Sequence, residues 1–205
     1  RMGVPEDFED QVAYDAYVDL LIRTGTIHQA SECWWGVRPA SRFPTLELRM
    51  TDACPRLEDA LCIASLFRLL VACAIDQPRP GSNWAQESRW ILQENRWRAK
   101  RFGIHASFIV EGYDRPFSAE QWLCLAEQIF GDAAQVMGVE EVFSQARRIL
   151  LQGTSAERQR NLYRQVLHNT GDMQAALTGV VDQLLRETAE QPCLNNDPTR
   201  AVCES

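Results

Sequence analysis

One short stretch of this chain alternates apolar and polar residues in the manner of a β-strand. Leu46, Leu48 and Met50 are separated by polar residues. A strand sends successive side chains to opposite faces, so we expect the apolar set on one face and Glu47 with Arg49 on the other. Glu47 and Arg49 are two positions apart along the strand, so their side chains are about 7 Å apart. The segments that follow are helical in pattern, so the fold must combine a small strand region with many helices.

The pair Glu47 and Arg49 has two interpretations. A carboxylate can bind a divalent metal while a nearby guanidinium binds the phosphate on that metal. The same alternation is common in antiparallel sheets, where a half-buried strand shows its charges to solvent. Periodicity alone does not distinguish a binding site from a solvated face.

A second strand is expected just before this one, from Trp34 to Pro39. Pro39 has no N–H to donate, so it ends that strand or lies at a sheet edge. The loop 40–44 is short enough for the two strands to pair antiparallel, although the sequence does not establish that they are direct neighbours.

Helical periodicity covers most of the remaining chain. Apolar residues recur at spacings of three and four over residues 8–23, 57–75, 84–102, 119–137, 140–152, 155–169 and 172–188. We expect N-caps at Ser118, Ser155 and Asp172, and glycines at several helix ends. Residues 77–82 form the clearest break, and 104–116 contain a strand-like segment. The pattern predicts an α+β fold, mostly helical, with a small antiparallel strand set.

Some of these helices carry predictions about burial. The helix over 57–75 is apolar almost all round, so we expect it in the middle of a bundle. Arg68 within it either pairs with a carboxylate or extends outward, and pairing is favoured. Cys62 and Cys73 lie in the same apolar pattern, where free thiols behave as small hydrophobes. On the next helix, the candidates for the core are Trp84, Ile91, Leu92 and Trp97.

Composition excludes several classes of function. The 205 residues suit one large domain or part of one. A net charge of −7 and a pI near 5.1 argue against broad binding to nucleic acid or anionic membranes, so neither is expected as a partner. The longest apolar run, Leu69–Ile75, is far shorter than the roughly 20 residues that cross a bilayer.

Two features bear on cellular location. The N-terminus lacks the apolar core of a secretory signal. The seven cysteines form no C-x-x-C pair, and an odd number in apolar settings favours free thiols. We therefore expect a reducing, cytoplasmic location.

A basic cluster lies at the end of the helix predicted over 84–102. It contains Arg96, Arg98, Lys100 and Arg101. Cations near a helix C-terminus complement the macrodipole, by about 0.3–1 kcal/mol each. That effect accounts for some of these residues but not for four together.

Several of these segments together resemble one family, the carboxylate–amine ligases of the glutamate–cysteine ligase type 2 family. The residues that carry the resemblance are Trp34–Pro39, Phe43–Arg49, Asp52 and Glu94–Gly103. The resemblance extends more loosely from about Gly3 to Thr188. It implies that residues 1–190 are the C-terminal portion of a glutamine-synthetase-like catalytic domain, whose larger active-site sheet the small strand set would join. Residues 191–205 are expected to be a loose tail.

The resemblance also implies a reaction. Such a ligase uses ATP to form an amide through an acyl phosphate that an amine attacks, with ATP and magnesium as cofactors and an amino-acid carboxylate and an amine as substrates. Glu47 would be a magnesium ligand and Arg49 a contact to the γ-phosphate. Arg38 would bind a substrate carboxylate or a phosphate, since a guanidinium suits both. Further substrate contacts, with a structural role as the alternative, are Trp35, Asn95, Arg96 and Arg101.

The chain departs from the family pattern in two places. Gly36 stands where the family usually has an acidic residue. The N-terminal half of the family domain, with a Gly-x-Glu-Glu-Glu strand that supplies magnesium ligands, has no counterpart; Gly138–Phe143 does not replace it because Val142 occupies the third acidic position. We therefore expect that missing half as a partner, and little ligase activity from this segment alone.

An alternative of a different class is a non-catalytic helical interaction module derived from such a ligase. Strand edges exposed in a half-domain invite pairing with another chain. Assembly into a homo-oligomer also stays open at this stage.

Overall fold

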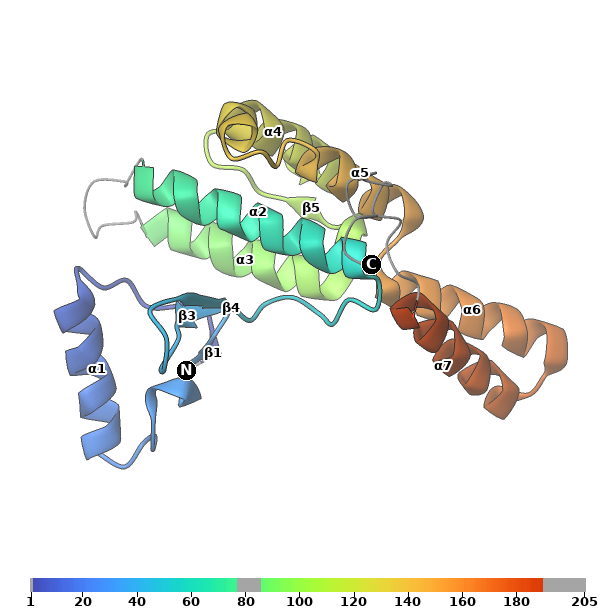
Figure 1. Ribbon diagram of the computed structural model, residues 1–205, viewed down its shortest axis with the longest axis horizontal. Coiled ribbons are helices and arrows are strands. Elements are labelled where there is room, and N and C mark those ends of the chain that lie inside the picture. Colours follow the sequence, from blue (N-terminus) through green and yellow to red (C-terminus); the bar gives the residue numbers. More distant parts are fainter. Residues whose placement is uncertain (1, 77–85, 190–205) are drawn as a thin grey trace, which may run out of the picture. The chain divides into compact units, whose positions relative to one another are not determined.

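The computed structural model describes residues 2–76 and 86–189 and is mostly helical, with three two-stranded sheets (Figure 1). This confirms the predicted helical character and the small strand pairs. The break at 77–82, the start of the helix predicted at 84 and the tail 191–205 lie outside the described residues.

The strands are short. β1 (Met2–Gly3) pairs parallel with β2 (Trp34–Trp35), β3 (Val37–Pro39) pairs antiparallel with β4 (Leu46–Leu48), and β5 (Ser107–Phe108) pairs antiparallel with β6 (Phe117–Ser118). The expected antiparallel hairpin is therefore present. The strand predicted from Trp34 to Pro39 is interrupted at Gly36, and the set is not wholly antiparallel because β1 runs parallel to β2. Two-residue strands such as β1 and β6 are too short to show an alternating pattern.

All the predicted helices are found, with ends shifted by a few residues. They are α1 (Gln11–Arg23), α2 (Leu57–Asp76), α3 (Gln86–Phe102), α4 (Ala119–Val136), α5 (Val142–Gln152), α6 (Ser155–Thr170) and α7 (Met173–Ala189). Two 3-10 turns, Ala30–Glu32 and Gly103–His105, join other elements. Within the described ranges, no helix is both long enough and apolar enough to span a bilayer.

Side-chain caps explain where several helices begin. The Ser118 hydroxyl accepts from the backbone N–H of Gln121, and the backbone N–H of Ser118 donates to the side-chain oxygen Oε1 of Gln121, as the capping-box pattern predicts. Asp172 caps α7 as expected. The prediction for α6 is wrong by one residue, because Thr154 forms the capping box with Glu157 and Ser155 is already helical.

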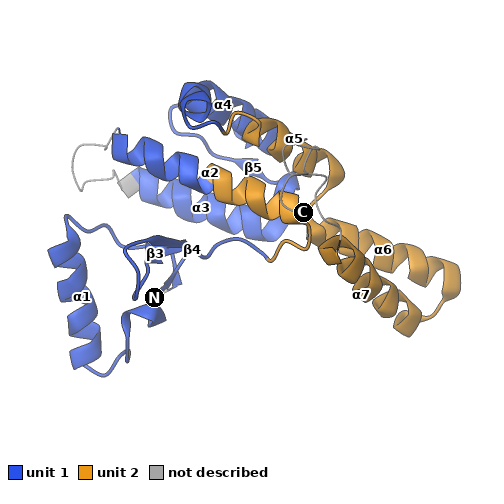
Figure 2. Ribbon diagram, viewed as in Figure 1, with its two compact units in different colours: residues 1–52, 67–138 blue, residues 53–66, 139–205 orange. Residues whose placement is uncertain are grey.

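The chain divides into two compact units (Figure 2). Unit 1 contains residues 1–52 and 67–138, and unit 2 contains 53–66 and 139–205. The core of unit 1 forms where α1 packs on β2. Its buried side chains are Tyr14, Val18, Ile27, Cys33 and Trp35, with Phe8 and Tyr17 packed against them.

Unit 2 is built around the helical hairpin of α6 and α7, which lie side by side (Figure 1). Gly171 makes the turn between them with a left-handed φ of 69°, which favours glycine. Val142 and Phe143 are buried in this unit. The buried Cys62 thiol donates to the Val142 carbonyl at 3.6 Å, and burial raises the pKa of Cys62 to about 11, so the thiol stays protonated.

Three burial predictions are wrong. Leu61 and Ile75 on α2 are exposed, so α2 is not covered all round by the described residues. Arg68 is exposed too, which supports its outward alternative over a buried ion pair. Leu92 and Trp97 on α3 are also exposed, although the Trp97 ring contacts Phe102 edge-on. Trp84 lies outside the described residues. An all-round apolar pattern shows that a helix can be buried, but burial also requires neighbours on every side.

Candidate functional site: an arginine–glutamate–arginine array

The register of the β3–β4 hairpin brings three predicted site residues together. Arg38 lies directly opposite Glu47, so both side chains share one face of the pair. Arg38 contacts the Glu47 Oε2 through Nε at 2.9 Å and Nη2 at 2.8 Å. Arg49 Nη1 donates to Glu47 Oε1 at 2.7 Å. This confirms that Glu47 and Arg49 share a face, and it settles that the two strands are direct neighbours.

Arg38 is a fixed, buried cation. Its side chain is only 7% exposed. Besides its two contacts to Glu47, its Nη1 donates to the carbonyl oxygens of Cys33, at 3.2 Å, and Ser31. Four of its five N–H donors are therefore engaged, and little capacity remains for a ligand. The predicted contact from Arg38 to substrate stays a prediction, while its role in holding Glu47 is visible in the structure.

Glu47 and Arg49 form the open part of the array. Their side chains are 37% and 34% exposed. Hydrogen bonds from Arg49 and then from Arg38 hold the pKa of Glu47 below its usual value, so the carboxylate is ionised near neutral pH. Arg49 commits Nη1 to Glu47, and its remaining donors suit a carboxylate or phosphate. The array thus offers an ionised carboxylate and an accessible guanidinium side by side.

The donor set allows Glu47 to act as one metal ligand and no more. Its Oε1 accepts one hydrogen bond, from Arg49, and so retains a lone pair. In the part of the chain that the structure describes, however, no group of three or more His, Cys, Asp or Glu side chains comes together. A magnesium ion at Glu47 would therefore need further ligands from beyond these residues.

Gly36 lies next to this array, bonded through its backbone to Gly3 and Arg49 and packed against Met50. The Gly36 N–H donates to the Gly3 carbonyl at 2.9 Å, and the Gly36 carbonyl accepts from the Arg49 N–H at 2.7 Å. A Cβ on Gly36 would lie 2.9 Å from the Met50 methyl, the flexible end of that side chain. Any side chain at position 36 would thus require Met50 to move. Leu46 in β4 and Met50 just after it are exposed, so the apolar side of residues 46–50 is less buried than alternation predicts.

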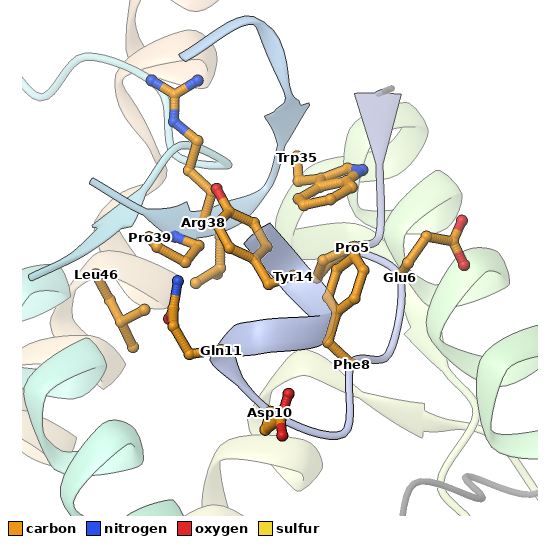
Figure 3. Close-up of a pocket in the computed structure, with 11 residues that line it drawn as sticks. Pro5, Glu6, Phe8, Asp10, Gln11, Tyr14, Trp35, Arg38, Pro39 and Leu46 are labelled. Atoms are coloured by element: carbon orange, nitrogen blue, oxygen red, sulfur yellow. The ribbon is translucent and has the colours of Figure 1, made fainter. Parts of the chain in front are cut away.

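A pocket of about 280 Å³ lies on the other face of the hairpin, against α1 (Figure 3). Its apolar walls include Phe8, Tyr14, Trp35, Val37, Pro39 and Leu46. Figure 3 shows the Arg38 guanidinium pointing away from the other lining residues, so only the stem of Arg38 lines the pocket. The pocket and the charged array are therefore separated by the strands.

Trp35 is part of the core beside this pocket. It is almost fully buried and stacks on Tyr17, with ring centroids 5.8 Å apart. Packing of an aromatic side chain accounts for this burial without a ligand. The substrate contact predicted for Trp35 stays a prediction.

The basic cluster on α3 contains side chains in different environments. Asn95 binds both backbone groups of Ile109, donating to its carbonyl at 2.7 Å and accepting from its N–H at 2.8 Å. Arg98 pairs with Glu94 and the Ser107 carbonyl. The Arg101 guanidinium lies 5.6 Å from the Phe102 ring centroid. The Nε atom of Arg96 is sealed from solvent with no acceptor among the described residues.

The contacts of Asn95 predict a structural effect. Asn95→Ala removes two hydrogen bonds and leaves the Ile109 backbone groups unpaired, so we expect the free energy of unfolding to fall by about 1–3 kcal/mol. Urea denaturation followed by tryptophan fluorescence measures it. Gln93→Ala, at an exposed position of the same helix, is the control. Equal stability of Asn95→Ala and the parent would show that these bonds are not maintained in solution.

Comparison with known proteins places this hairpin in a family. Residues 1–189 match the model of Glutamate-cysteine ligase family 2, and the chain belongs to that family. Similar relatives are named "Putative glutamate–cysteine ligase 2". One from Pseudomonas fluorescens is 44% identical over 199 residues, which are 97% of this chain and 51% of the relative. One from Rhodospirillum rubrum is 38% identical over 190 residues, 92% of this chain and 48% of the relative.

The chain spans about half the length of these relatives. A third, from Pseudomonas entomophila, is 46% identical over 188 residues, which are 91% of this chain and again 48% of the relative. The family membership therefore applies to the matched residues 1–189.

Proposed function

We propose that this chain supplies one wall of the active site of an ATP-dependent carboxylate–amine ligase of the glutamate–cysteine ligase type. The observation that carries the proposal is the array of Arg38, Glu47 and Arg49 on a chain of this family. In the complete ligase, the β3–β4 hairpin would join a larger sheet of the glutamine-synthetase kind.

The chemistry divides into two steps. A carboxylate oxygen of the first substrate attacks the γ-phosphorus of ATP, and ADP leaves. The amine of the second substrate then attacks the acyl carbon, the C–N bond forms, the nitrogen loses one proton to solvent and phosphate departs with the C–O bond electrons. Arg49 suits the transferred phosphoryl group, because a guanidinium can bind two of its oxygens at once. Arg38 would hold Glu47 in place during both steps.

Magnesium, when bound, neutralises the charge of the ATP phosphates, and Glu47 would supply one of its ligands. A single carboxylate does not hold a catalytic metal centre by itself. We therefore expect no ATP-dependent amide formation from residues 1–205 alone. Measurable magnesium-dependent γ-glutamyl transfer by the purified chain would contradict this.

A chimera tests the proposal. In it, this chain replaces the matched segment of the Pseudomonas fluorescens relative, to which it is 44% identical. We expect glutamate-dependent ADP release when an amine acceptor such as cysteine is present. The relative itself is the positive control, and a screen of amino-acid pairs in the same assay identifies the substrates. A folded chimera without activity, beside an active relative, would contradict the proposal.

The alternative, a non-catalytic interaction module, is favoured by one observation: the apolar side chains Leu46 and Met50 of the β4 segment are exposed. Such a surface suits a protein partner. The same chimera discriminates between the two functions, because a non-catalytic module would let the chimera fold but would not support turnover of ATP.

A further inference from the structure

The pocket between α1 and the β3–β4 hairpin has no part in the proposed reaction. It lies on the side of the hairpin opposite the array, and all its lining residues belong to unit 1 (Figure 3). Its volume is about 280 Å³. An apolar cavity of about 150 Å³ is enough for one benzene ring. The pocket therefore has room for a substituted single ring or for two fused rings.

The walls of this pocket favour an aromatic ligand. The rings of Phe8 and Trp35 have centroids 5.8 Å apart, and Tyr14 lies edge-on to Phe8 at 5.5 Å. Pro39 and Leu46 of the hairpin supply aliphatic walls. Aromatic rings pack edge-to-face or offset at such distances, so a further ring can extend the same cluster.

The charged groups of the lining residues are engaged elsewhere. Glu6 pairs with Arg89 at 3.1 Å, and Figure 3 shows its carboxylate pointing away from the other lining residues. Asp10 is the N-cap of α1, and its side chain accepts a backbone N–H at 2.8 Å. The Arg38 guanidinium is held by Glu47 on the other side of the strands. A charged ligand would lose its hydration without gaining a counter-ion, which disfavours it strongly.

Two polar side chains of the pocket keep bonding capacity. Tyr14 is 8% exposed, and its hydroxyl makes no hydrogen bond within the part of the chain that the structure describes. Burial raises the pKa of Tyr14, so the hydroxyl stays protonated and can donate. Gln11 uses its Nε2 to bind Asp15 at 2.8 Å, which leaves its side-chain oxygen as an acceptor. Because Gln11 and Tyr14 are three residues apart on α1, this donor and this acceptor are neighbours on one helix face.

We propose that the pocket binds a small neutral aromatic molecule that has one or two rings and carries a carboxamide. The ring would lie against the aromatic wall, the amide carbonyl would accept from the Tyr14 hydroxyl, and the amide N–H would donate to Gln11. A buried hydroxyl without a partner is unfavourable, so this ligand gains affinity from the new bond as well as from apolar burial. The inference goes beyond the proposed function, because the charged groups of the array lie outside the pocket.

The test uses the 205-residue chain labelled with ¹⁵N, with benzamide as the probe. Benzamide has one ring and the amide, and benzoate is its charged counterpart of nearly equal size. The indole N–H signal of Trp35 and the backbone amides of Gln11 and Leu46 are followed by NMR. We expect saturable shifts with benzamide and an apparent Kd for benzoate that is about tenfold higher or more.

Three variants locate the ligand, and their amide spectra show whether each is folded. Tyr14→Phe removes the hydroxyl alone and should raise the Kd for benzamide about threefold to tenfold, the range of a single neutral hydrogen bond. Tyr163→Phe makes the same change in unit 2 and should leave the Kd unchanged. Leu46→Trp replaces a partly exposed aliphatic wall with a ring that fills the pocket, so the saturable shifts should disappear.

Three results would overturn the inference: no saturable shift with benzamide, equal affinity for benzamide and benzoate, or equal affinity in the parent and Tyr14→Phe. Unchanged binding by Leu46→Trp would place the ligand outside the pocket and would overturn it as well. None of these outcomes depends on turnover by the chimera. An inactive chimera with intact benzamide binding would reject the proposed function alone.

Discussion

Replacing Arg158 with alanine is expected to lower the free energy of unfolding by about 3–5 kcal/mol, because it removes one partner of a buried ion pair. Arg158 is 11% exposed and Glu187 is 6% exposed. The guanidinium binds both oxygens of Glu187, through Nε at 3.0 Å and Nη2 at 3.2 Å. Its Nη1 donates to the Gly153 carbonyl at 2.7 Å. One side chain therefore ties α6 to α7 and to the turn before α6.

The pair belongs to a larger charge cluster within unit 2. Asp59 lies 3.5 Å from Arg158, and Arg56 contacts Glu187 at 3.3 Å. Without Arg158, Asp59 loses this ion pair and Glu187 keeps only the partly exposed Arg56 as a cationic partner. Denaturation followed by circular dichroism measures the loss. All six tryptophans lie within the residue ranges of unit 1, so tryptophan fluorescence reports separately on that unit.

Arg160→Ala is the matched control for Arg158→Ala. Arg160 is on the same helix, 60% exposed, and 3.9 Å from Glu157. An exposed pair of this kind is worth less than about 1 kcal/mol. Similar losses from the two variants would contradict the account of the buried cluster.

The same cluster predicts a dependence on pH. Burial opposes ionisation of Glu187, but hydrogen bonds from Arg158 and Gln183 and the charges of Arg158 and Arg56 outweigh it, so its pKa is lowered from 4.5. A lowered pKa in the folded state adds stability above the unfolded value and loses it as pH falls. We expect the stability difference between the parent and Arg158→Ala to be full near pH 7 and to shrink below about pH 4.5. A difference independent of pH would exclude Glu187 as its source.

Glu47→Gln is expected to lower the turnover of the active chimera by about 10²–10³-fold, the range seen when one preorganised electrostatic contact is removed. The amide keeps the shape of the side chain but removes the negative charge that faces Arg38 and Arg49. It also removes the carboxylate that would bind magnesium. Steady-state kinetics with ATP and both substrates measure the loss, which should appear in kcat as well as in kcat/KM.

The control for this variant is Glu58→Gln. Glu58 is also partly exposed and pairs with one arginine, Arg148, at 3.0 Å, but it lies in unit 2. Its turnover should stay close to the parent value. Glu47→Gln also removes the counter-charge of the buried Arg38, so thermal unfolding is expected at a lower temperature even though the two carbonyl contacts of Arg38 remain. Helix content at the assay temperature must match the parent, so that turnover is measured on folded protein. Near-normal kcat in Glu47→Gln would remove Glu47 from the site.

The hairpin at the centre of this account was predictable because alternation determines which side chains share a face. Glu47 and Arg49 follow from period two alone, and the short loop to β3 makes antiparallel pairing feasible. The contacts that bury Arg38 were not predictable, because the carbonyl oxygens of Ser31 and Cys33 are backbone groups that any residue presents. The two-residue strand β1 likewise carries no pattern of its own.

Burial on helices was harder to predict than the helices themselves. The apolar surface of α2 and the tryptophan at position 97 indicated a core, yet exposure depends on elements that approach from elsewhere. The sequence alone likewise does not determine the environments of all the basic residues at the end of α3. Arg98 pairs with Glu94 one turn earlier on the same helix, a spacing that the sequence contains. The position of Arg96 against Gly3, with its Nε lacking an acceptor among the described residues, depends on tertiary contacts.

Trapping the acyl phosphate shows whether the array serves carboxylate activation by ATP. Hydroxylamine replaces the amine substrate, and the chimera is incubated with ATP, magnesium and glutamate. We expect γ-glutamyl hydroxamate from the parent chimera and about 10²-fold less from Glu47→Gln, with Glu58→Gln unchanged. Equal hydroxamate from the parent and Glu47→Gln would contradict this role of the array.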